Sequence, residues 1–168
     1  MPIIETVKGN ILDAKEDVIV QQCNCVTITA CGLSKVIKQK WKWADPYGSR
    51  RREGRKNCAI SDDRDIPGTI RVLETKETKT PKVVCLFSQW SPGKSNIRYE
   101  KTYPDGKYDR LRYFEECLWK LDEYCKENRI KTVAVPYGIG CGLAGGNWND
   151  YVKELEKTKV DVVLYKLE

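Results

Sequence analysis

Five glycines are packed into one short segment near the end of the sequence. The segment from Pro136 to Trp148 reads PYGIGCGLAGGNW, with an apolar run, Val133–Val135, before it and an amphipathic run after it. Glycine lets a backbone turn through positive φ and lets a ligand approach without a Cβ in the way. A glycine loop between a strand and a helix directs several N–H groups at one point. The segment therefore predicts an anion site, most typically for phosphate.

Two familiar phosphate-binding motifs fit this loop poorly. Gly140, Gly142 and Gly145 match the spacing of the dinucleotide fingerprint GxGxxG. That motif needs an acidic residue at the end of the next strand, whereas Asp161 stands at its start. No Gly-Lys-Ser/Thr follows the loop, which argues against a P-loop ATPase. A tight glycine turn without a ligand is the alternative interpretation.

The residue types also limit the chemistry. The chain has no histidine, so a Ser–His or Cys–His pair is excluded. Cys141 lies in the glycine loop, where a helix N-terminus could lower the pKa of its thiol, or where it could simply pack beneath the loop. Cys23, Cys25 and Cys31 lack the usual zinc spacings. We expect no metal site and no cofactor.

Composition indicates an ordinary globular domain spanning residues 1–168. Apolar residues make up 40% of the chain and charged residues 32%. No apolar run reaches the roughly 20 residues of a membrane helix, and no signal peptide is evident, so we expect an intracellular protein, cytoplasmic or nuclear, without membrane contact. Cys85, Cys117 and Cys125 lie in apolar runs, which favours free thiols over a disulfide scaffold.

The net charge of +6 is unevenly distributed. Residues 35–56 hold nine basic side chains against two acidic ones, Asp45 and Glu53. This region is either a solvated surface or a funnel for a polyanion such as nucleic acid, with Trp41, Trp43 and Tyr47 as stacking groups.

Apolar periodicity predicts alternating strands and helices. Strands are expected at Ile3–Val7, Val18–Cys23, Ile70–Leu73, Val83–Ser88, Thr132–Val135 and Val160–Leu167. Helices are expected at Leu33–Trp41, Arg110–Glu127 and Asn147–Lys157. The alternation indicates an α/β fold with three layers, helices on both faces of a central mixed sheet of about six strands.

Two loops follow predicted strands and lead into predicted helices. They are the glycine loop and the segment Asn24–Gly32. Ligands of open α/β sheets bind outside the carboxyl ends of strands, so the two loops are expected to clamp one ligand. The long segment Ser88–Asp109 has the length of a functional flap or a mobile loop.

Four short motifs in order carry a resemblance to a known family. They are VKGNIL at Val7–Leu12, VIVQQCNC at Val18–Cys25, Gly32-Leu33, and GCGL at Gly140–Leu143. Together they resemble the macrodomain family, and within it the branch of the yeast ADP-ribose-1″-phosphate phosphatase and the terminal ADP-ribose glutamate hydrolase. The resemblance spans nearly the whole chain. It implies an ADP-ribose ligand, free or attached to protein, in a cleft at the strand ends.

The resemblance also implies roles for individual residues. Asn10, beside Ile11, matches the aspartate that reads the adenine amino group, and its neutral amide can still accept a hydrogen bond. Asn24 matches the asparagine beside the distal ribose, and Gln21 precedes it on the same motif. The expected ligand-binding set is completed by Gly32 and Leu33 in the first loop and by Gly140, Cys141, Gly142, Leu143 and Ala144 in the diphosphate loop.

The catalytic groups of the family are replaced in this chain. Gln21 stands where the phosphatases have a histidine, and Ala144 where the hydrolase has an aspartate. Neither can act as a general base at neutral pH. Asn24 would then orient a water, with Asp45 as the candidate base, although Asp45-Pro46 is also a turn signal. Weaker candidates are Tyr47, Lys35 and Gln22. A reader that binds ADP-ribosyl groups without turnover is the alternative.

Overall fold

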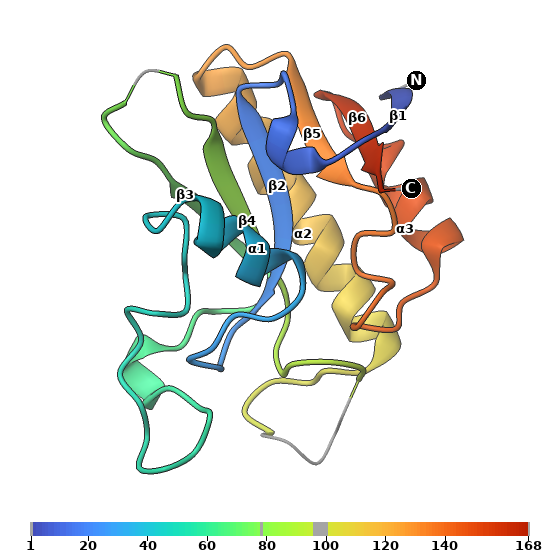
Figure 1. The fold of residues 1–168 in the computed structure, drawn as a ribbon. Helices are drawn as coiled ribbons and strands as arrows, with labels where there is room; N and C mark the ends of the chain where they lie inside the picture. The colour runs from blue at the N-terminus through green and yellow to red at the C-terminus, as the bar shows by residue number, and fades with distance from the viewer. Residues whose placement is uncertain (1, 78, 96–100, 168) are drawn as a thin grey trace.

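A six-stranded sheet with the order β1-β6-β5-β2-β4-β3 forms the centre of the molecule (Figure 1). The computed structural model describes residues 2–77, 79–95 and 101–167. The strands are β1 (Ile3–Lys8), β2 (Val18–Asn24), β3 (Thr69–Leu73), β4 (Lys82–Gln89), β5 (Thr132–Pro136) and β6 (Asp161–Lys166). The helices are α1 (Leu33–Lys40), α2 (Lys107–Glu127) and α3 (Trp148–Leu155), with short 3-10 turns at Ile11–Asp13 and Ser61–Asp63.

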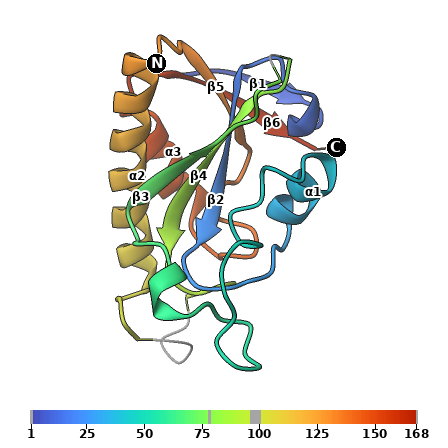
Figure 2. The same cartoon turned by 90° about the vertical axis from the view of Figure 1, so that its left-hand side faces the viewer.

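The direction of the strands decides where loops converge. All neighbouring pairs from β1 through β6, β5 and β2 to β4 are parallel, and only β3 runs antiparallel to β4. The carboxyl ends of β2, β4 and β5 therefore lie at one edge of the sheet, below the strands in the view of Figure 2. The glycine loop follows β5 and the Asn24–Gly32 loop follows β2, so both reach this edge.

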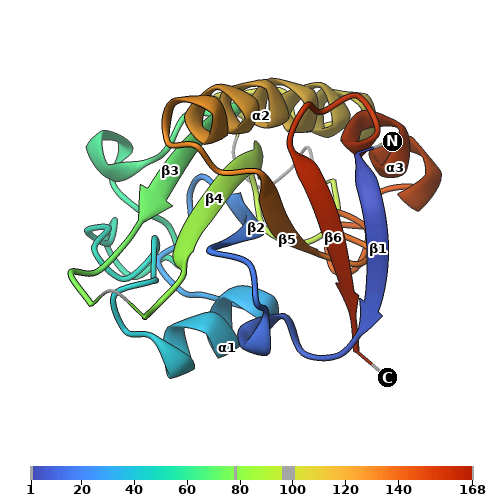
Figure 3. The same ribbon diagram turned by 90° about the horizontal axis from the view of Figure 1, so that it is seen from above.

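Helices cover both faces of the sheet. Seen from above, α2 and α3 lie on one face and α1 on the other (Figure 3). The first face buries an apolar cluster that includes Phe114, Leu121 and Leu155, and the second buries one that includes Ile19, Ile37 and Phe87. Strand β4, buried along almost its whole length, contains the continuous apolar run Val83–Phe87 for this reason.

The structure confirms the predicted α/β class and the mixed six-stranded sheet. The strands and helices match their predicted ranges within a few residues. The largest difference is at α2, which begins three residues before the predicted Arg110, because the carboxylate of Asp109 accepts the N–H of Gly106 and extends the first turn. Of the long Ser88–Asp109 segment, residues 96–100 lie outside the described residues.

The eight cysteines, which composition predicts to be free, all have unbridged thiols. Most are buried, as their apolar sequence context indicates, and Cys31 is the exposed one. Within the described part of the chain, no helix is long and apolar enough to cross a membrane.

Candidate ligand-binding site

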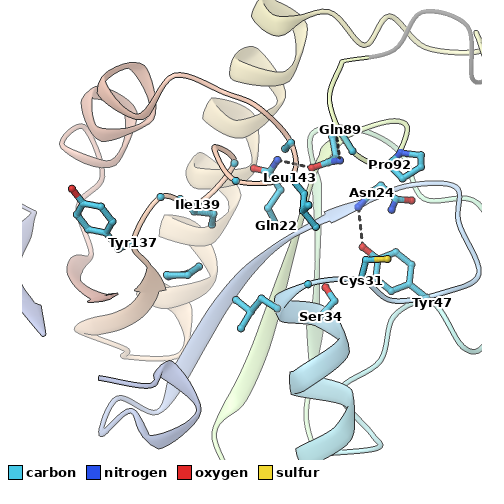
Figure 4. A pocket seen from close by; sticks show the side chains of 18 residues that line it. Gln22, Asn24, Cys31, Ser34, Tyr47, Gln89, Pro92, Tyr137, Ile139 and Leu143 are labelled. Atoms are coloured by element: carbon cyan, nitrogen blue, oxygen red, sulfur yellow. Dashed lines mark hydrogen bonds between the residues drawn. The ribbon is translucent and has the colours of Figure 1, made fainter. Parts of the chain in front are cut away.

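A cavity of about 270 Å³ opens at the carboxyl ends of the parallel strands. Figure 4 shows Tyr137 at one end of it, and Pro92 and Asn24 at the other. Its walls come from the loop after β2, the start of α1, the end of β4 and the glycine loop. The predicted residues that line it are Asn24, Gly32, Leu33, Gly140, Gly142, Leu143 and Ala144.

The glycine loop presents backbone donors to this cavity. Within the described residues, the N–H groups of Gly140, Gly142, Leu143 and Ala144 donate no hydrogen bond. The loop keeps its shape through other bonds, since the N–H of Gly145 donates to Gly142 O (3.1 Å) and that of Gly146 to Gly140 O (2.9 Å). Unpaired donors on a fixed backbone are suited to hold an anion.

Glycine is required where this loop is tightest. Gly140 has φ +77, and a Cβ there would lie 2.4 Å from Cε2 of Tyr151, on α3. The opposite wall is formed by Gly32, with φ +57, directly before α1. A Cβ at Gly32 would lie 3.3 Å from Cδ1 of Leu143, so the two loops approach each other across the cavity.

The first turn of α1 faces the cavity with free donors. The N–H groups of Leu33 and Ser34 have no acceptor among the described residues. The Ser34 hydroxyl donates to Oε1 of Gln21 at 2.7 Å, and this bond ties the helix start to β2. Gln21 is 1% exposed, so its side chain holds α1 in place and does not line the cavity.

Asn24 organises the loop that follows β2. Its Oδ1 accepts the N–H groups of Val26 (3.0 Å) and Thr27 (2.9 Å), and its Nδ2 donates to the Thr27 hydroxyl. The backbone N–H of Asn24 donates to the hydroxyl of Tyr47 at 3.0 Å. Burial raises the pKa of Tyr47 well above its ordinary value. The second N–H of Asn24 Nδ2 is the donor that remains for a ligand.

A buried arginine supports the same loop from behind. Arg50 donates to the carbonyls of Thr27 (2.8 Å) and Asn24 (3.0 Å) and pairs with Asp65 at 2.6 Å. Its guanidinium also lies 4.8 Å from the centre of the Tyr47 ring. Arg50 therefore stabilises the Asn24–Gly32 loop from inside the protein. It is one of the nine basic residues of the region 35–56, which the sequence suggested as a surface for a polyanion.

Two glutamines join the ends of β2 and β4. Nε2 of Gln89 donates to Ser91 O at 2.9 Å, so its Oε1 faces β2 and accepts Nε2 of Gln22 at 2.7 Å. This order fixes the Gln22 amide, whose Oε1 is buried without a partner among the described residues. Both side chains line the cavity and supply neutral polar groups at its floor.

Arg110 connects the two loops that flank the cavity near Pro92. Its guanidinium donates to Gly93 O (2.6 Å) after β4 and to Ala144 O (3.2 Å) in the glycine loop. It also forms a buried pair with Asp105 at 2.8 Å. Burial by itself raises the pKa of Asp105, but hydrogen bonds from Arg110 and Ser91 and the charge of Arg110 outweigh it and hold the pKa below its ordinary value.

The lining of the cavity is electrically neutral. Among the described residues, no acidic, lysine or arginine side chain lines it. Cys141, predicted as part of the diphosphate loop, does not line it either. Its thiol donates to Ile139 O at 3.4 Å, and burial, with a smaller effect from Asp150, raises its pKa to about 11. The hypothesis of a lowered thiol pKa is therefore wrong, because burial disfavours the thiolate.

Three further predicted residues lie outside the cavity walls. Asn10 caps the turn after β1 by accepting the N–H of Leu12 at 3.0 Å, and Ile11 is buried beside it. Both follow the carboxyl end of β1 and so belong to the same edge of the sheet. Asp45 accepts the N–H of Tyr47 at 2.9 Å and lies 3.6 Å from Lys38, which matches the turn signal in the sequence.

Sequence reasoning missed Gln89, Pro92, Gly93 and Tyr137 as lining residues. The signal that could have found Gln89 and Tyr137 was present, because each stands at or just after the end of a predicted strand. No comparable sequence signal marks Arg50 and Arg110 as residues that hold the loops around the cavity.

The basic region 35–56 is largely engaged within the protein. Besides Arg50, Arg51 pairs with Asp63 at 3.0 Å and Lys40 with Asp13 at 3.5 Å. Tyr47, expected as a stacking group in the nucleic-acid alternative, is only 3% exposed. Its ring therefore lies beneath the surface.

Comparison with known proteins gives structural likeness only. No protein-family model and no curated protein matches the sequence. The macrodomain of Mycobacterium tuberculosis DarG matches with a TM-score of 0.68 and 22% identity, over 96% of this chain and 95% of that one. The macrodomain of Thermus aquaticus DarG gives 0.66 and 21%, over 96% of each chain. Thermosipho africanus DarTG in complex with ADP-ribose gives 0.63 and 17%, over 96% of this chain and 40% of that one.

Proposed function

Because this chain has the macrodomain fold, we propose that its strand-end cavity binds ADP-ribose or an ADP-ribosyl group. The observation that carries the proposal is the pair of facing backbone donor sets, from Gly142–Ala144 and from the first turn of α1. A diphosphate between them is held by N–H groups and a helix N-terminus. The ADP-ribose complex of a structure with this fold supports the choice of ligand.

The rest of the ligand follows from the two ends of the cavity. The distal ribose lies beside Asn24 and Gly32, where an amide donor is free. The adenosine lies toward Tyr137, whose ring is 40% exposed and packs on Trp148 with centroids 4.9 Å apart. Beyond Tyr137 the sheet continues through β6 to β1, so an adenine base extending in this direction reaches Asn10 and Ile11.

We expect ADP-ribose to bind with a micromolar Kd, equivalent to about −7 to −9 kcal/mol. The physical reason is that the site is built of fixed backbone donors and needs little rearrangement. Isothermal titration calorimetry measures the affinity, and ADP and ribose-5-phosphate serve as partial ligands. The absence of both heat and thermal shift at millimolar ADP-ribose contradicts the proposal.

Hydrolysis at the distal ribose is the second candidate function. The amides of Asn24 and Gln89 lie toward the Pro92 end of the cavity and can orient a water. Since no charged side chain of the described residues lines the cavity, a base from the walls is lacking. The water is then activated by the ligand's own phosphate or by Asp45 after a change in the turn that holds it. Assays on ADP-ribose-1″-phosphate and on mono-ADP-ribosylated protein separate the phosphatase, the hydrolase and the non-catalytic reader.

Variants at Asn24 and Asp45 divide binding from turnover. Asn24→Ala should weaken ADP-ribose binding by a hydrogen bond's worth, about 0.5–1.5 kcal/mol. Asn24→Asp keeps the two bonds accepted from Val26 and Thr27 but removes the amide donor. A loss of affinity in this variant is therefore due to the lost contact with the ligand and not to a changed loop.

Asp45→Ala should leave affinity nearly unchanged and lower any turnover at least tenfold, about 1.4 kcal/mol of barrier. Full turnover in Asp45→Ala removes it as the base.

A further inference from the structure

A second, smaller cavity lies against the glycine loop, next to the first. It encloses about 160 Å³ between that loop, the segment after β4 and the start of α2. Ala144 lines both cavities, and Lys94 of the second follows Gly93 of the first in the chain. The proposed ADP-ribose site does not include this cavity.

The lining of this second cavity is basic. Lys94, Lys107 and Arg110 line it, and no acidic side chain of the described residues does. Arg110 is neutralised by Asp105. Lys94 and Lys107 form no ion pair within the described ranges. Two lysines of the lining therefore lack a counter-charge among the described residues, and a concave surface of this kind attracts anions.

The backbone around the cavity adds to this positive potential. Helix α2 begins at Lys107 and continues for 21 residues, and the Asp109 carboxylate in its first turn is engaged by the N–H of Gly106 at 2.9 Å. The N–H groups of its first turn carry the positive end of the helix dipole. Tyr151, only 3% exposed, lines the same cavity, and its hydroxyl has no hydrogen-bond partner among the described residues. Burial raises the pKa of Tyr151 to about 12, so its hydroxyl remains a donor at neutral pH.

Glycines keep the cavity open. A Cβ at Gly145 would lie 3.0 Å from Cγ of Lys94, and one at Gly146 would lie 2.6 Å from Cε1 of Tyr151. Side chains at these positions would push the lysine stem and the tyrosine ring out of place. At about 160 Å³, against about 270 Å³ for the first cavity, the space suits a ligand smaller than ADP-ribose, such as one phosphate group.

We propose that this second cavity is an anion subsite for a phosphate-class group, held by Lys94, Lys107, the start of α2 and the Tyr151 hydroxyl. The subsite is independent of the proposed function, since it shares only Ala144 with the first cavity. The two cavities adjoin at Gly93 and Lys94. A ligand in the first cavity that carries a further phosphate beyond Pro92 could therefore place that phosphate in the second cavity.

Titration with inorganic phosphate, followed by amide NMR at constant ionic strength, tests the subsite. We expect a millimolar Kd and shifts at Lys107, Gly145 and Gly146. Lys94→Ala/Lys107→Ala should weaken this binding at least fivefold. The matched control is Lys42→Ala/Lys126→Ala, which removes the same charge from two exposed lysines elsewhere, Lys126 being at the far end of α2. Phosphate binding in the control should match the wild type within twofold.

Two results overturn the proposal. One is equal weakening in both double variants, which indicates unspecific attraction to the net positive charge. The other is a set of shifts confined to Gly142 and Leu143 that disappears when ADP-ribose is added, which places the phosphate in the first cavity. If the protein fails to bind ADP-ribose, only the proposed function is contradicted. The phosphate titration needs no ADP-ribose, so it tests the second cavity independently.

Discussion

Gly142→Glu is expected to abolish ADP-ribose binding and to leave the fold intact. An ideal Cβ at Gly142 meets no atom within 4 Å, and the residue is not among the glycines with positive φ. A side chain is therefore accommodated without strain at a residue that lines the cavity. We expect its carboxylate to compete with the diphosphate for the donors of this loop and to repel the diphosphate charge.

We expect at least a hundredfold loss of affinity, about 2.7 kcal/mol, with a free energy of unfolding within about 0.5 kcal/mol of the wild type. Calorimetry and denaturant unfolding measure the two quantities. Gly142→Gln has the same size without the charge, so the difference between the variants isolates electrostatics from bulk. If Gly142→Glu binds ADP-ribose within threefold of the wild type, the diphosphate does not lie at this loop.

Arg110→Met should produce the largest loss of stability. It removes one partner of an ion pair in which both side chains are almost completely buried, 2% and 3% exposed. Breaking such a pair leaves Asp105 charged and unpaired, which costs about 3–5 kcal/mol in unfolding free energy. The carbonyls of Gly93 and Ala144 also lose their donor, so ADP-ribose affinity should fall in parallel.

The control is Arg112→Met on the same helix, where the ion pairs are half exposed and contribute at most about 1 kcal/mol. The pH dependence gives a second measurement. The folded-state pKa of Asp105 lies below its unfolded value near 3.9, so its contribution is complete above that value and is lost as the pH falls through the folded pKa. In Arg110→Met the pKa of Asp105 rises, and the stability difference from the wild type should narrow on acidification. A difference that is constant from pH 7 to pH 4 contradicts this role of the pair.

The fold could be predicted from the sequence because its signals are local. Each signal is contained in one short stretch of sequence: the apolar residues of β2, β4 and β5, and the apolar face of α2. The order of the strands has no such local signal. The glycine loop with Gly142 was therefore predicted from its own residues, and Asn24 from its place in a motif that resembles a known family. Gln89, in contrast, becomes a neighbour of Gln22 only through the pairing of β2 with β4.

Charged residues were the least predictable part. Arg50 and Arg110 contribute to the net charge like any surface arginine, yet both are buried and hold the loops around the cavity. Whether an arginine is exposed depends on long-range packing against carbonyls and a carboxylate, here Asp65 and Asp105. Composition therefore counts Arg50 and Arg110 as basic surface, whereas in the structure both are buried and hydrogen-bonded to loop carbonyls.

The pairing of the first strand with the last has a consequence for the order of folding. Ile3 pairs with Val162 and Val7 with Tyr165, so β1 has no partner in the sheet until β6 has been synthesised. Closing a loop of that length must precede the pairing, and long-range contacts of this kind form slowly. We expect β2 and β4, whose partners lie closer in the sequence, to assemble earlier on a nascent chain. The turn at Asn10, where we propose that the adenine lies, would then be the last to take shape.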